Sequence, residues 1–187
     1  MTHLPVKLST ADLVAWFSRN GDRFVRTIGW KTGYGEVDCL LQSVPGTSTE
    51  EWPADPPLQQ VVLETFGAPS RSVAFGLGMT GPGHWSLASE VVGPQGTRIQ
   101  FDWACRVQRP AEHLGTAYQT IAGAASQLRR LTDADASWEF ADGRSLNLTV
   151  TLGRLVCREG DQRIAIEPAS DIRTVGTHCW RYCFWVG

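Results

Sequence analysis

The sequence predicts a single α+β domain over residues 1–187: a large, twisted, mainly antiparallel β-sheet packed on one long helix, with a short helix near the N-terminus. Three observations predict this fold. Residues 84–107 alternate between apolar and polar side chains on both sides of a turn, other segments alternate in the same way, and residues 111–131 carry an apolar stripe at helical spacing. A sheet of many strands curls, so the prediction allows for a nearly closed sheet.

The short helix is predicted at residues 12–18. Ser9 or Thr10 can cap its N-terminus, and Asp12 lies in its first turn, where the helix dipole favours a negative charge. Asn20-Gly21 would end it. Three apolar residues recur on one helical face: Leu13, Trp16 and Phe17.

Four strands are expected before the hairpin at 84–107. Residues 23–30 and 36–44 form a first pair around a glycine-rich turn, and residues 45–57 form a long polar loop. Further strands follow at 58–66 and 71–79. In the last strand, apolar side chains alternate with small ones, so another group can approach its bare face closely: Ala74, Gly76 and Gly78.

The hairpin at 84–107 turns at residues 93–97, and its two strands alternate with period two. If Val92 pairs with Arg98, one face of the hairpin is almost entirely apolar and the other almost entirely polar. A slip of one residue would bury charges and expose tryptophans, so the pattern specifies the register. The expected polar-face pairs are Glu90 with Gln100, Ala88 with Asp102, Ser86 with Ala104, and His84 with Arg106.

The long helix is predicted at residues 111–131, and its alanine-rich stripe would pack on the apolar face of the sheet. The stripe comprises Leu114, Ala117, Tyr118, Ile121, Ala124, Ala125, Leu128 and Leu131. Five more strands are expected after the helix: 138–141, 145–152, 154–158, 163–167 and 177–186. Arg154 should lie opposite Glu167, and the last strand, which has few polar residues, should be central in the sheet.

Composition limits the classes of function. The formal net charge is −2 and no block of like charge occurs, so neither nucleic acid nor an anionic membrane is an expected partner. No apolar run has the length of a membrane-spanning helix, and residues 1–7 lack a secretory signal. Five cysteines, an odd number, suit free thiols in a reducing compartment. We therefore expect a soluble, cytoplasmic protein.

The polar face of the hairpin is the candidate ligand-binding site, with His84, Ser86, Glu90, Asp102 and Arg106. A histidine, two carboxylates and an arginine on one surface suit acid–base chemistry or the binding of an anion. The bare face of strand 71–79 would form a concavity beside them. The competing interpretation is a solvated outer face with cross-strand charge pairs, which antiparallel sheets commonly have.

No metal site or cofactor is expected. Cys179 and Cys183 share one face of a strand and His178 points to the other, so the three cannot bind one ion. The glycines at 76, 78 and 81 match the spacing of a dinucleotide-binding loop, but a strand follows them where the loop needs a helix.

Three functions remain open. The first is an accessory protein that binds a small or anionic ligand in a concavity of the sheet. The second is a hydrolase that uses His84 with Glu90 or Asp102, although no nucleophile motif is present and no catalytic residue is assigned. The third is a protein-interaction domain, and the expected partners include a second copy of the chain.

Overall fold

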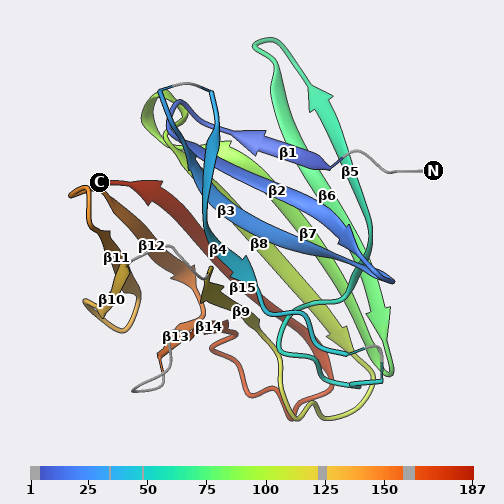
Figure 1. The fold of residues 1–187 in the computed structure, drawn as a ribbon. Helices are drawn as coiled ribbons and strands as arrows, with labels where there is room; N and C mark the ends of the chain where they lie inside the picture. The colour runs from blue at the N-terminus through green and yellow to red at the C-terminus, as the bar shows by residue number, and fades with distance from the viewer. Residues whose placement is uncertain (1–4, 34, 48, 122–125, 158–162) are drawn as a thin grey trace.

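A computed structural model describes residues 5–33, 35–47, 49–121, 126–157 and 163–187. These residues form two antiparallel β-sheets that face each other across a common core, as a β-sandwich (Figure 1). They include no α-helix, and their one helical turn is η1 (Pro94–Gly96). The prediction of an α+β domain is therefore wrong.

Each sheet combines strands from distant parts of the chain. The seven strands of the first sheet, sheet A, lie in the order β1 (Val6–Ser9), β2 (Leu13–Asn20), β3 (Arg23–Lys31), β4 (Val37–Ser43), β9 (Thr116–Thr120), β14 (Arg163–Glu167) and β13 (Arg154–Cys157). The eight strands of the second, sheet B, lie in the order β10 (Ser126–Arg130), β11 (Asp135–Phe140), β12 (Ser145–Leu152), β15 (Gly176–Val186), β8 (Arg98–Val107), β7 (Gly83–Val92), β6 (Arg71–Thr80) and β5 (Leu58–Phe66). A single, nearly closed sheet is thus ruled out as well.

Aromatic side chains fill the space between the sheets. Phe17 of sheet A lies against Phe101 of sheet B, with ring centroids 6.4 Å apart, and Trp30 meets Phe140 edge-on at 4.5 Å. Such pairs contribute about 0.5–1.5 kcal/mol each beyond the area that they bury. The apolar face of the hairpin β7–β8 therefore packs on sheet A, and not on a helix.

The helix predicted at residues 12–18 is wrong, because residues 13–18 belong to strand β2 and Asp12 lies in the turn before it. The Thr10 hydroxyl accepts hydrogen bonds from the backbone N–H groups of Asp12 and Leu13, as a helix cap would. The chain instead turns back, and Ser9 pairs with Val14 to start the β1–β2 ladder. The same side-chain hydrogen bonds stabilise a turn as readily as a helix start, and pairing with two neighbouring strands decides the outcome.

The helix predicted at 111–131 is also wrong for the residues that the structure describes. Strand β9 lies between β4 and β14 and pairs with both, and β10 pairs with β11. Gly115, directly before β9, lies close to β14, since a Cβ there would lie 2.6 Å from the Ile166 carbonyl oxygen. Ala124 and Ala125 of the predicted stripe lie outside the described residues.

Most of the predicted strands are confirmed. Those at 58–66 and 145–152 have the predicted bounds, and the one at 71–79 extends by one residue. Arg154 lies opposite Glu167 as expected, and the last residue of the strand predicted at 154–158 lies outside the described residues. Strand β15 lies between β12 and β8, which confirms its central position. The described residues include no helix of the length and apolarity needed to cross a membrane.

Candidate functional site

The hairpin β7–β8 positions the candidate site, and its predicted register is confirmed at every pair. His84 lies opposite Arg106, Ala88 opposite Asp102, and Glu90 opposite Gln100. The alternation directs these side chains away from the core, to the outer face of sheet B. His84, Ser86 and Arg106 are exposed, while Glu90 and Asp102 are half-buried. No layer of the described structure covers this face.

Neighbouring strands extend the face on both sides. On β6, Met79 lies opposite His84 and Leu77 opposite Ser86. These two apolar side chains are 58% and 57% exposed, so they form an uncovered apolar surface beside the polar residues. On β15, Thr177 lies opposite Arg106. The face therefore changes from apolar at β6 to polar at β8 within three strands.

A hollow of about 450 Å³ lies at the end of this face where β5, β6 and β7 meet. It is lined by Gln59, Gln60, Leu77, Gly78, Met79, His84 and Trp85. The Gln59 amide accepts from the Met79 N–H at 2.7 Å and donates to the Met79 carbonyl at 2.8 Å. This side chain replaces a missing backbone partner at the β5 bulge and holds one side of the hollow in place.

The concavity beside the polar face is formed by other residues of β6 than those predicted. Gly76 and Gly78 face the core, and not the polar face, because Gly78 pairs with the buried Trp85. A Cβ at Gly78 would lie 2.2 Å from the Pro57 carbonyl oxygen, so the chain's own backbone occupies the space beside this glycine. The apolar residues of β6 are the ones that lie beside His84.

Both predicted carboxylates are paired with arginines. Asp102 accepts a hydrogen bond from Nε of Arg181 at 2.9 Å and contacts its terminal nitrogen as well. Glu90 forms an ion pair with Arg71. These arginines come from β15 and β6, the strands that flank the hairpin, and each neutralises the charge of its partner.

The carboxylates are also distant from His84. Asp102 lies opposite Ala88, four residues along β7 from His84, which corresponds to about 13 Å at ~3.3 Å per residue. Glu90 is six residues away on the same strand, or about 20 Å. The His84 Nε2 atom instead lies 3.2 Å from the amide nitrogen of Gln108, which donates to it. In the described part of the chain, this face thus has no histidine–carboxylate pair.

Arg106 differs from the other arginines of this outer face. Arg71 and Arg181 bind carboxylates, and the Arg98 guanidinium lies 5.3 Å from the centre of the Trp185 ring. Within the described part of the chain, Arg106 has neither an ion pair nor a ring contact. Its cross-strand neighbours are His84 and Thr177, which carry no negative charge. A guanidinium in such surroundings suits an anionic group from outside the protein.

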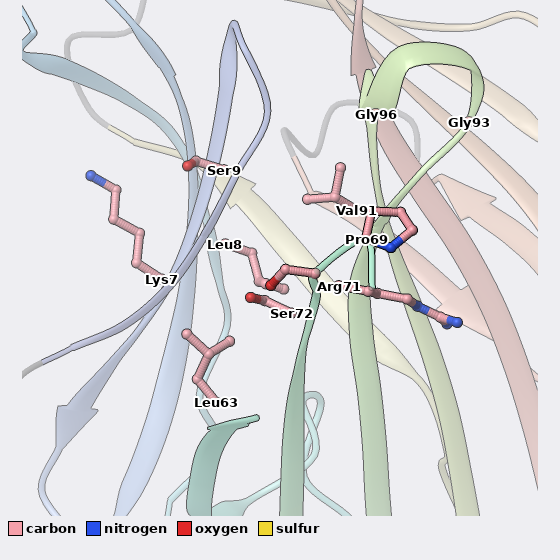
Figure 2. Close-up of a pocket in the computed structure, with 11 residues that line it drawn as sticks. Lys7, Leu8, Ser9, Leu63, Pro69, Arg71, Ser72, Val91, Gly93 and Gly96 are labelled. Atoms are coloured by element: carbon pink, nitrogen blue, oxygen red, sulfur yellow. The ribbon is translucent and has the colours of Figure 1, made fainter. Parts of the chain in front are cut away.

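Another hollow, of about 590 Å³, lies between β1, the β5–β6 hairpin and the β7–β8 turn (Figure 2). Its lining includes Lys7, Ser72 and Arg71. In Figure 2 the Lys7 and Arg71 side chains extend to opposite sides, away from Ser72 between them. Because Arg71 is already paired with Glu90, this hollow is less suited to binding an anion than the face at His84 is.

The sequence did not indicate the polar cluster inside the sandwich. Arg26, fully buried on β3, forms an ion pair with Asp55, and its Nε donates to the Tyr118 hydroxyl at 3.3 Å. The Tyr118 and Tyr182 hydroxyls are 2.9 Å apart, and the Arg26 guanidinium lies 4.6 Å from the centre of the Trp103 ring. The signal in the sequence was Arg26, the one charged residue within residues 24–30.

Burial governs the titration of this cluster. It raises the pKa of Asp55 to about 6, although Arg26 and the Ser43 hydroxyl favour the charged carboxylate. Burial disfavours the charge on Arg26, but Asp55 and the tyrosines more than offset this and raise its pKa. The side chains are closed off from solvent, so the cluster fixes the 45–57 segment to sheet A and is not a ligand site.

Of the residues considered for metal binding, His178 has other partners. The buried His178 has both ring nitrogens bonded, to the Ser170 hydroxyl and the Thr174 carbonyl, each at 2.8 Å. Among the described residues, no three histidine, cysteine or acidic side chains come together as metal ligands do.

These features define the class of the protein as a two-sheet antiparallel β-sandwich with an uncovered, partly apolar and partly polar outer face. Comparisons with known proteins add no family. No protein-family model matches the chain, and no curated protein sequence matches it significantly.

Proposed function

We propose that the protein is a non-catalytic binding module for a small molecule that joins a carboxylate or phosphate group to an apolar part. The anionic group would lie between His84 and Arg106. The apolar part would lie on Leu77 and Met79, over the hollow that these residues form with His84. The observation that carries the proposal is the position of Arg106 directly beside this hollow, with no carboxylate partner among the residues that the structure describes.

Binding suits this geometry better than catalysis. Hydrolysis by His84 with Glu90 or Asp102 would need the acid within hydrogen-bond distance of the histidine. The strand spacing separates them by about 13 Å or more, and both carboxylates already bind arginines. An anion held by a guanidinium needs only the contacts that this face presents.

The proposal includes a cytoplasmic location. All five cysteines are free thiols, and three of them lie on sheet B. Free thiols persist in a reducing compartment.

The test is a binding titration with benzoate and phenyl phosphate, which carry the two anionic groups on the same apolar ring. We expect shifts of the His84 ring resonances and an increase in melting temperature. Arg106→Ala should weaken binding about 10- to 100-fold, because a hydrogen bond to a charged group contributes about 1.5–3 kcal/mol.

Arg98→Ala is the matched control, since Arg98 lies on the same strand and face but contacts Trp185. This variant should bind as the wild type does. Equal affinity in Arg106→Ala and Arg98→Ala, or binding that leaves the His84 resonances unchanged, would contradict the proposal.

A further inference from the structure

The two sheets have four edge strands, and one of them differs from the rest in length and chemistry. Strands β1 and β13 have four residues each and contain Lys7 and Arg154, and β10 has five residues with Arg129 and Arg130. Short strands and cationic side chains are what proteins use to prevent pairing at a sheet edge. Strand β5 has nine residues and no Lys, Arg or Pro.

Strand β5 is also exposed over most of its length. Residues 62–66 are all exposed, including Val62 at 51% on the outer face and Leu63 at 44% on the inner face. In Figure 1 the β5–β6 hairpin extends beyond β1 at the edge of the sandwich. An edge strand directs about every second N–H and C=O away from its sheet, so this edge presents unpaired backbone groups beside apolar side chains.

The pattern of polar and apolar residues in β5 is the same in both directions, so it matches that of a second, antiparallel copy. The segment Gln60-Val61-Val62-Leu63-Glu64 is polar, apolar, apolar, apolar, polar in either direction. With a two-fold axis at Val62, this residue lies opposite its own copy, Val61 opposite Leu63, and Gln60 opposite Glu64. Shifting the axis to Leu63 would place Val62 opposite Glu64, and shifting it to Val61 would place Leu63 opposite Gln59.

Charge is compatible with the same register. Glu64 is the one charged residue of β5, and it would face the Gln60 amide of the other copy, which can donate to it. No like charges are placed opposite each other, which would destabilise a cross-strand pair.

We infer that two copies of this chain associate through β5, edge to edge, with Val62 on the two-fold axis, so that their sheets B become one continuous sheet. A contact of this kind is isologous and closes as a dimer. The occupant of the edge is thus a second copy of this chain, because a partner of unrelated sequence would have no reason to match the symmetric pattern of β5.

The test is the molar mass of the intact protein, measured by light scattering after size exclusion up to submillimolar concentration. The wild type should approach twice the chain mass of 20.5 kDa. Val62→Lys should shift the mass to that of the monomer and weaken association by at least about tenfold, since two ammonium groups would meet on the axis. A monomeric wild type, or an assembly larger than a dimer, would overturn the inference.

Met79→Lys is the matched control, because Met79 is equally exposed on the same face but lies on β6. This variant should remain dimeric, and so should Arg106→Ala, which separates this inference from the proposed ligand site. Dimer loss in Met79→Lys equal to that in Val62→Lys would show that the apolar face, and not the strand edge, is the contact.

Hydrogen exchange of the wild type tests the edge without a substitution. The amides of residues 60–64 that point away from β6 should become protected as the concentration rises. Protection that does not depend on concentration would overturn the inference.

Discussion

Replacing Arg26 with Met tests the role assigned to the buried cluster. Methionine has a similar length and can pack on the Trp103 and Tyr118 rings, but it removes the guanidinium from Asp55. The Asp55 side chain is 2% exposed, so its carboxylate would be left in the core without its ion-pair partner. Breaking a buried ion pair from one side costs about 3–5 kcal/mol.

This magnitude is measurable. Domains of this class have unfolding free energies of about 5–15 kcal/mol, so the variant would lose a large part of its stability. At about 2–4 °C per kcal/mol, the melting temperature should fall by about 6–20 °C. Equilibrium unfolding in urea, followed by tryptophan fluorescence, gives the free-energy difference directly.

The double variant Arg26→Met/Asp55→Leu provides the control. With both charges replaced by apolar groups, we expect recovery of most of the loss, because apolar replacements of buried ion pairs are often neutral or stabilising. A loss of unfolding free energy below about 1 kcal/mol in Arg26→Met would refute the assigned role. A double variant that loses more than the summed losses of the two single variants would refute it as well.

The pH dependence has a defined sign. An unfolded aspartate titrates near ~3.9, and burial raises the pKa of Asp55 in the folded protein to about 6. Between these values the folded state holds a proton that the unfolded state has released, so the contribution of Asp55 to stability is lost as the pH rises through this range. Without Arg26, the pKa of Asp55 should rise further, and the cost of Arg26→Met should be smaller at pH 5 than at pH 8.

Two further predictions concern the core. Gly78→Ala should destabilise the protein by about 1–3 kcal/mol in the same urea assay, because its Cβ would lie 2.2 Å from the Pro57 carbonyl oxygen. Gly33→Ala should be nearly neutral, because the space around Gly33 is open. The exposed thiol of Cys179 should react with Ellman's reagent in the folded protein. Cys105 should react only after unfolding, because burial raises its pKa to about 12, and a fast reaction in the native state would contradict its position in the core.

The alternation of residues 84–107 was sufficient to predict a ten-residue register because both faces of the hairpin had to agree with it. Residues 12–18 and 111–131 show the opposite case. The apolar spacing of Leu13, Trp16 and Phe17 fits a helix, but the successive residues 13–15 are all buried, so both faces of β2 are covered there. A strand that is covered on both faces has no period-two pattern, so neighbours that are distant in the sequence determine its structure.

The candidate site was predictable within the hairpin and not beyond it. His84 and Arg106 are neighbours through the hairpin turn, which the sequence specifies locally. The partners of the two carboxylates, Arg71 and Arg181, come from other strands, and the order of strands in a sheet does not follow from alternation. The pairing of Arg26 with Asp55 depends on how the 45–57 segment enters the core, for which the sequence carries no periodic signal.

The position of β15 has a consequence for the kinetics of folding. Strands β5 to β8 form a meander of hairpins between sequence neighbours, and β10 to β12 form another. These two parts of sheet B are joined by β15 alone, in pairs such as Phe101 with Tyr182 and Leu148 with Phe184. Because contacts between distant residues slow folding, the search of β15 for its place between two preformed meanders should set the folding rate.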